Sequence, residues 1–228
     1  MRILCNTSTV LTAALFTAAE LICSTALASP QVSFKPAEVA SAADTRYPVE
    51  SIADGVVVLN VALTERGKVS GIDAVRDVPS LTSAATSSVA SWKFKPASQD
   101  GLLQASAMTV AFVFRPPVSL WKPPSFASAI SNPKSITPAY TPAGIVSVGY
   151  AEYPVNSVAA GAVVVQVTVD DHGKIERMKV IRSMRGFTQF ALRAAKQWRF
   201  QPATLEGKPV VSNVAIAFVF APPNPISP

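Results

Sequence analysis

The chain contains Trp92-Lys93-Phe94-Lys95-Pro96-Ala97 and, 106 residues later, Trp198-Arg199-Phe200-Gln201-Pro202-Ala203. The same spacing relates Tyr47-Pro48 to Tyr153-Pro154, and Phe112-Val113-Phe114 to Phe218-Val219-Phe220. Because a single spacing relates all these pairs, no insertion separates them, and the sequence predicts one structural unit written twice. We call the two repeats the first copy and the second copy.

The repeat sets the expected domain organisation. We expect a first domain at residues 34–117, a second at residues 140–223, and a short tail at residues 224–228. The segment between them, residues 118–139, contains four prolines, which is typical of a semi-rigid linker.

Residues 1–28 have the features of an export signal. A positive start at Met1-Arg2 precedes an apolar run that ends in Ala26-Leu27-Ala28, the small-x-small pattern of a cleavage site. The alternative is an uncleaved membrane anchor, since Thr9 to Ala28 is long enough to span a bilayer, although Glu20 would lie inside it. We therefore expect a cleaved signal peptide and an exported protein.

Each copy has the pattern of a small α+β domain. Alternating apolar residues predict a strand at 57–63 and at 163–169, and Gly67 and Gly173 follow at the positions where a hairpin turn favours glycine. Return strands, a helix with apolar residues at helical spacing, and a last strand complete each copy. We expect two tandem small domains, each a three-stranded antiparallel sheet (hairpin, helix, strand) with the helix packed on one face.

Composition excludes several classes of protein. Apolar residues make up 49% of the chain and charged residues 15%, which excludes a disordered charged protein. The single His, His172, lies with Asp170 and Asp171 in a turn, where Asp is expected for conformational reasons. We expect no catalytic residue, no metal and no cofactor, and hence no enzyme.

The formal net charge of +6 belongs mainly to the second copy. Residues 47–116 carry six basic and six acidic residues, whereas residues 153–222 carry nine basic and four acidic residues. This excess is consistent with a solvated face, or with docking of the second domain on an anionic envelope surface. Nucleic acid is not an expected partner, because the protein is exported.

The aromatic motif residues allow two interpretations. Trp92 and Trp198 lie on the apolar helix faces, which favours core packing over ligand binding. Tyr47-Pro48 and Tyr153-Pro154 favour a role in fixing the chain path, because proline restricts itself and its predecessor, but they are also candidate partner contacts.

Together these motifs resemble the TonB C-terminal domain family, from Tyr47 to Pro116 and again from Tyr153 to Pro222. The resemblance implies a periplasmic module of the energy-transducing type, which grips an extended segment of an outer-membrane receptor by strand addition. The chain departs from the family at Asp44 and Tyr150, where the transducer has glutamine, and in having two tandem domains.

The resemblance also implies where a partner would bind. In the family the binding edge is that of the last strand, and the corresponding residues here are Thr109, Val110, Ala111, Phe112, Val113, Phe114, Ala215, Ile216, Ala217, Phe218, Val219 and Phe220.

Three functions follow from these expectations. The first is a non-enzymatic periplasmic protein that binds an extended peptide of an outer-membrane receptor or another envelope transport protein. The second is a structural or scaffold module whose domains pair edge to edge, within a chain or as a homo-oligomer. The third is an inner-membrane-anchored energy transducer of TonB-dependent transport.

Overall fold

The computed structural model describes residues 33–51, 53–115, 127–131, 139–154 and 157–221. The predicted signal peptide, the tail and most of the predicted linker lie outside these residues. Within the linker, β9 (Ala127–Ser131) is described as a strand.

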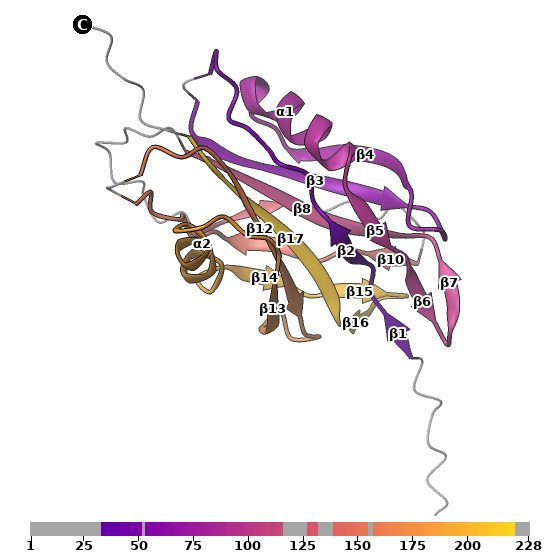
Figure 1. Cartoon of the computed structure of the whole chain (residues 1–228). Helices are drawn as coiled ribbons and strands as arrows, with labels where there is room; N and C mark the ends of the chain where they lie inside the picture. Colours follow the sequence, from indigo (N-terminus) through magenta and orange to yellow (C-terminus); the bar gives the residue numbers. More distant parts are fainter. Residues whose placement is uncertain (1–32, 52, 116–126, 132–138, 155–156, 222–228) are drawn as a thin grey trace, which may run out of the picture. The chain divides into compact units, whose positions relative to one another are not determined.

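Both copies contribute to one six-stranded sheet (Figure 1). Its strand order is β13-β12-β17-β8-β3-β4. The bounds of these strands are β3 Gly55–Leu63, β4 Val69–Arg76, β8 Ser106–Arg115, β12 Gly161–Val169, β13 Ile175–Arg182 and β17 Ser212–Phe220. All neighbours are antiparallel except β8 and β17, the last strands of the two copies, which are parallel.

The turn of each hairpin contains a glycine, because the backbone conformation and a neighbouring backbone segment leave no room for a side chain there. Gly67 and Gly173 have φ angles of +73° and +79°, in the left-handed region that favours glycine. A Cβ atom at these positions would lie 2.4 Å from the carbonyl oxygen of Phe94 or Phe200. Both the turn conformation and the close contact therefore require glycine.

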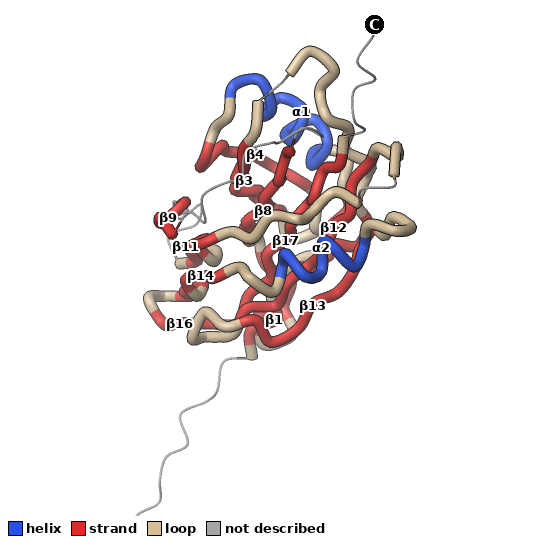
Figure 2. Tube along the Cα trace, turned by 90° about the vertical axis from the view of Figure 1, so that its left-hand side faces the viewer, coloured by secondary structure: helices blue, strands red, loops and turns tan. Residues whose placement is uncertain are grey.

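The two helices lie on opposite faces of the sheet (Figure 2). They are α1 (Pro79–Ala90) and α2 (Thr188–Ala195). Trp92 and Trp198, which follow them, are 4% and 0% exposed, so the expectation that they pack in the core is confirmed.

Each hydrophobic core draws on both copies. Leu81, on the buried face of α1, shares a core with Phe112 of its own copy and with Ala215 and Ala217 of the second copy. The core beneath α2 is formed mainly by the second copy, and Ala111 of the first copy contributes to it. Because both faces are covered, the residues of β8, β12 and β17 are buried almost throughout.

Short strands surround the six-stranded sheet in three small three-stranded sheets and one pair. Their orders are β1-β6-β7, β10-β15-β16, β14-β11-β9 and β2-β5. The bounds are β1 Phe34–Lys35, β2 Glu38–Ser41, β5 Lys93–Lys95, β6 Ala97–Gln99, β7 Leu102–Gln104, β10 Tyr140–Thr141, β11 Gly144–Ser147, β14 Arg199–Gln201, β15 Ala203–Leu205 and β16 Lys208–Val210.

The α+β class agrees with the sequence, and three strands pair antiparallel within each copy, β4-β3-β8 and β13-β12-β17, but these two sets are joined into one sheet. The strands of both copies share one mixed sheet, and the described residues of both copies form one compact unit. The physical reason is that each last strand exposes backbone donors and acceptors, and the equivalent strand of the other copy satisfies them. The proposed domain boundaries remain a prediction.

Candidate functional site

The last strands, where the sequence placed partner binding, lie in the middle of the sheet. β8 is bonded to β3 on one side and to β17 on the other, and β17 is likewise held between β12 and β8. In the β8–β17 pair, Thr109 to Arg115 run beside Val214 to Phe220. The expected open edge is therefore closed in this structure, and peptide binding by these strands stays a prediction that requires them to separate.

The register of this pair places large side chains beside small ones. On the α1 face Phe112 neighbours Ala217, and on the α2 face Phe218 neighbours Val113. Neighbouring residues of a parallel pair point to the same face, whereas equivalent residues of the two copies point to opposite faces because their helices do. The distance in sequence between paired residues must therefore differ from the repeat distance of 106 residues by an odd number. Thr109 pairs with Val214, 105 residues later, so the difference is one residue.

The segment before each hairpin, which we call the arm (residues 34–44 and 140–150), reaches the other copy through buried hydrogen bonds. Asn213 Nδ2 donates to the Ala37 carbonyl at 2.9 Å, and Val39 N–H donates to Gln166 Oε1 at 2.7 Å. In the opposite direction Thr109 Oγ1 donates to the Ala143 carbonyl at 2.7 Å. Each arm is thus anchored on the sheet strands of its sister copy.

Asp44 and Tyr150, which end the two arms, also contact the sister copy. Asp44 Oδ1 accepts the Ala162 N–H at 3.1 Å and lies 3.3 Å from a guanidinium nitrogen of Arg182. The guanidinium of Arg115 lies 5.4 Å from the centre of the Tyr150 ring. Burial raises the pKa of Tyr150, and the nearby Asp54 carboxylate adds to this effect.

The two Tyr-Pro tyrosines close equivalent loops. Tyr153 Oη donates to the Ala159 carbonyl at 2.9 Å, and Tyr47 Oη donates to the Ala53 carbonyl. Their rings pack on the last strands, against Phe220 and Phe114. These contacts favour the structural interpretation of Tyr-Pro, and a partner contact by Tyr47, Pro48, Tyr153 or Pro154 stays a prediction.

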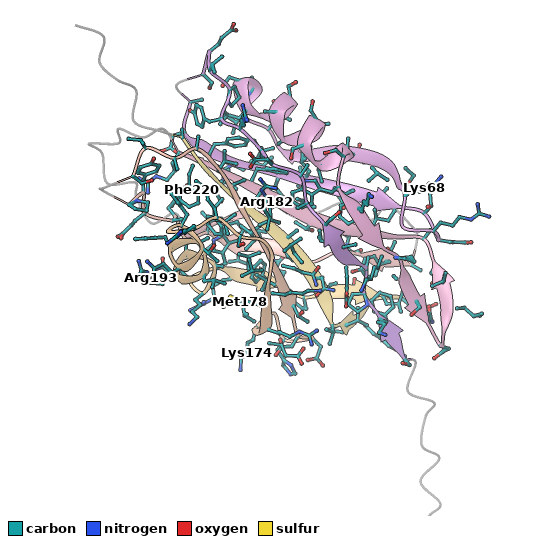
Figure 3. All side chains as sticks on the ribbon, in the orientation of Figure 1. Lys68, Lys174, Met178, Arg182, Arg193 and Phe220 are labelled. Carbon is teal, nitrogen blue, oxygen red and sulfur yellow. The ribbon has the colours of Figure 1, made fainter. Side chains whose placement is uncertain are left out.

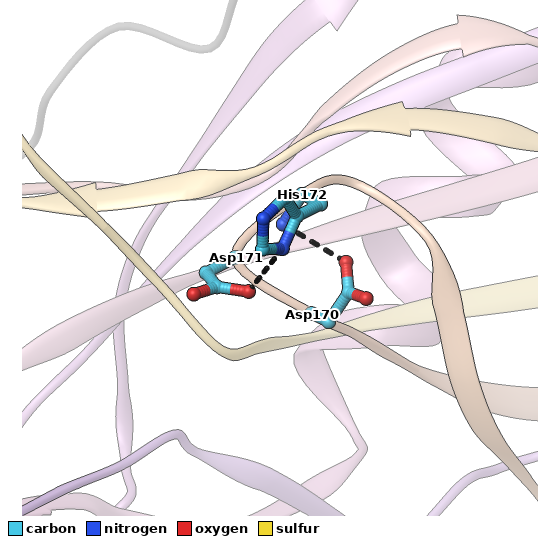
Figure 4. A group of neighbouring side chains, drawn as sticks. All are labelled: Asp170, Asp171 and His172. Atoms are coloured by element: carbon cyan, nitrogen blue, oxygen red, sulfur yellow. Dashed lines mark hydrogen bonds and ion pairs between the residues drawn. The ribbon is translucent and has the colours of Figure 1, made fainter.

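In the turn cluster Asp170, Asp171 and His172, the last two residues are exposed and Asp170 is half-buried (Figure 4). Asp170 Oδ1 accepts the backbone N–H of Lys174 at 2.7 Å and of His172 at 2.9 Å, and these bonds lower the pKa of its carboxyl group. Asp171 is 2.6 Å from His172 Nδ1. Asp170 therefore serves the turn itself.

The family described as Gram-negative bacterial TonB protein C-terminal matches the sequence twice, over residues 45–116 and residues 150–222. These two segments make up more than half of the chain. The chain belongs to the TonB C-terminal family. No curated protein and no solved structure matches it.

Membership of the TonB C-terminal family indicates an envelope protein with a role in transport. Domains of this family are non-catalytic and interact with proteins of the outer membrane or envelope. Among the described residues, neither helix is long and apolar enough to cross a membrane.

The TonB C-terminal motifs gave no indication of the polar residues that join the copies. Thr109, Gln166 and Asn213 are buried in strands that are mainly apolar. A buried polar residue in such a strand needs a hydrogen-bond partner, and this signal was present in the sequence. The partners are backbone groups of a distant arm, which no local pattern identifies.

Proposed function

We propose that this TonB C-terminal family member is a non-enzymatic periplasmic protein whose two copies act as one preassembled unit. It docks an extended segment of an outer-membrane transport partner, and this segment binds at an outer edge of the six-stranded sheet. The observation that carries the proposal is the parallel pairing of β8 with β17, which uses the strand edges that a single domain of this kind would leave open.

The outer edges of the sheet belong to β4 and β13, the return strands. Within the described residues each pairs with a single neighbour, β3 or β12, so one side of each ladder remains for strand addition. β9 lies beside β4 without pairing with it.

Of the two edges, β4 is better suited to an extended partner. β13 carries exposed Glu176, Arg177 and Lys179, and charged side chains on an edge strand oppose edge-to-edge pairing. In β4 only Asp73 is both charged and exposed. We therefore assign the docking edge to Val69–Arg76.

The scaffold interpretation is the second candidate, and the same β8–β17 pair supports it. If the copies serve only to hold each other, the protein needs no peptide ligand. The anchored-transducer interpretation depends on residues 1–28, which lie outside the described part of the chain.

The test is an NMR titration of the ¹⁵N-labelled protein with peptides from the extended periplasmic segments of outer-membrane receptors. We expect amide shifts along Val69–Arg76 and protected amides along 109–114 and 215–220. Shifts confined to 109–114 and 215–220 would support the edge predicted from the sequence instead. A lack of shifts with every peptide would leave the scaffold interpretation.

The matched control is the same peptide with proline at alternate positions. Proline lacks the N–H group and cannot extend a ladder, so this peptide should not shift the β4 amides. Equal shifts with both peptides would contradict strand addition.

A further inference from the structure

One segment of the second copy contains several basic residues and no acidic residue. Between Arg177 and Leu205 there is no Asp or Glu. The run contains seven basic residues: Arg177, Lys179, Arg182, Arg185, Arg193, Lys196 and Arg199. The equivalent run of the first copy, residues 71–99, holds three basic and two acidic residues, so the repeat itself does not require the charge.

Four of these cations gather at α2 and are exposed. Arg185 lies in the turn before the helix, Arg193 in its last turn, Lys196 at its end, and Arg199 just beyond. Figure 3 shows Arg193 on the side of α2 that faces away from the sheet. We call these four residues the α2 basic face.

Helix stability explains only part of the α2 basic face. Cations near the C-terminus of a helix are favourable, which accounts for Arg193 and Lys196. Arg185 precedes the N-terminus, where a cation is unfavourable. None of the ion pairs among the described residues involves these four cations.

The equivalent surface of the first copy is neutral on α1. The residues at the places of Arg185, Arg193 and Lys196 are Pro79, Ser87 and Ala90, and only Arg199 has a cation, Lys93, at the equivalent position. Two copies of one unit therefore present different chemistry on opposite faces of the sheet, with a strong positive charge on one of them.

We propose that the α2 basic face docks the protein on an anionic phospholipid surface. Arginine and lysine side chains bind phosphate, and guanidinium groups bind it in bidentate fashion. A bilayer presents such phosphates over an extended plane, which matches several exposed cations at and around one short helix.

The absence of apolar anchors favours a lipid surface over a protein partner. Stable protein interfaces are centred on buried aromatic or aliphatic residues. Among the described residues the exposed large hydrophobic side chains are Val49, Leu102, Leu103 and Val158, and none lies on α2. Attraction at the α2 basic face is therefore mainly electrostatic.

The test is co-sedimentation of the purified protein with vesicles of phosphatidylcholine alone or with about 30 mol% phosphatidylglycerol. We expect binding to the anionic vesicles only, and loss of binding as salt rises from about 0.1 M to about 0.5 M. The triple variant Arg185→Gln, Arg193→Gln, Lys196→Gln should bind about 100-fold more weakly, since each cation contributes roughly fivefold.

The matched control removes three positive charges from the first copy instead. Arg66, Lys68 and Lys93 are exposed cations of the first copy, and replacing all three with Gln should change binding much less. The variant Arg185→Lys, Arg193→Lys keeps the charge and should keep the binding. Unchanged unfolding midpoints would show that every variant is folded.

Three results would overturn the proposal: no binding of the wild type to anionic vesicles, equal loss in the two Gln triples, or equal binding to neutral vesicles. A soluble polyglutamate peptide tests the other class of partner. If the wild type binds this peptide through α2 and does not bind vesicles, the α2 basic face recognises an acidic protein instead.

Discussion

Asp170 and Thr64 occupy the same position in the two hairpin turns, and they hold the turn with different chemistry. Asp170 Oδ1 accepts the N–H groups of His172 and Lys174, whereas Thr64 Oγ1 accepts the N–H of Lys68 at 3.2 Å. Bonds to a charged oxygen are the stronger kind. The second turn is therefore held by an ionisable group and the first by a neutral one.

This difference predicts a pH-dependent contribution from the second turn. The backbone N–H of Lys174, followed by that of His172, holds the pKa of Asp170 below its ordinary value. A carboxyl group with a lowered folded-state pKa adds stability above its unfolded pKa, roughly 3.9, and this stability is lost as pH falls through the folded value. Asp170→Asn should thus lower the free energy of unfolding at pH 6 but not at pH 2.

Denaturant titrations of the variant and the wild type at several pH values measure this difference. Thr64→Ala is the matched control, because the hydroxyl of Thr64 does not titrate in this range, and its effect should be the same at each pH. An Asp170→Asn effect that is equally large at pH 2 would show that the turn depends on shape rather than charge.

Single residues were predictable where their role is local. Gly67, Gly173, Trp92 and Trp198 serve their own hairpin or helix, and the repeat identified them because both copies contain them. Asn213 has alanine at the equivalent position of the first copy, Ala107, and its partner carbonyl is 176 residues away. Such a residue belongs to the interface between copies, and a repeat pattern cannot identify it.

At the scale of elements, the arms and the sheet strands stabilise each other across the two copies. Asn213 is buried, donates to the Ala37 carbonyl and accepts the Thr168 hydroxyl at 2.9 Å. In the other direction Thr109 donates a side-chain bond to the Ala143 carbonyl of the second arm. A buried polar group that loses its partner retains the full cost of its desolvation.

Replacing Asn213 with Leu should therefore destabilise the whole protein. The change leaves the Ala37 carbonyl and the Thr168 hydroxyl unpaired, and we expect a loss of about 2–4 kcal/mol in the free energy of unfolding. Thr109→Val keeps the side-chain shape and should cost about 1–2 kcal/mol. Chemical denaturation followed by circular dichroism measures both values.

Ser183→Ala, at an exposed position after β13, is the control and should change stability by less than about 0.5 kcal/mol. If Asn213→Leu is as mild as this control, the arm is held by its own β2–β5 pairing and the bond to the other copy is incidental.

Hairpin, helix and last strand could be predicted within each copy because apolar periodicity and turn glycines are local signals. The pairing of β8 with β17 could not, because a strand edge that binds a peptide and one that binds a sister strand have the same apolar alternation. One indication was present. Ala111, Ala215 and Ala217 are small on the face away from their own helix, as close packing against a second layer requires.

At the scale of the whole molecule, one sheet and two mixed cores join the copies into a single structural unit, which we expect to unfold cooperatively. Leu81, on the buried face of α1, is 0% exposed and lies in a core that also contains Ala162 and Val164 of β12. A cavity in this core removes contacts from strands of both copies. Two independent domains would instead confine the damage to the first copy.

Leu81→Ala should therefore accelerate hydrogen exchange in the second copy. A buried Leu→Ala change costs about 2–5 kcal/mol, and amides that exchange only through global unfolding then exchange roughly 30-fold faster or more. We expect this acceleration along Val163–Val169 as well as along β3, measured by mass spectrometry of peptides from the intact chain. Leu103→Ala, at a position 57% exposed, should leave both strands unchanged. Faster exchange in β3 with an unchanged β12 would mean that the copies unfold separately, and that the β8–β17 pair can open to admit a peptide.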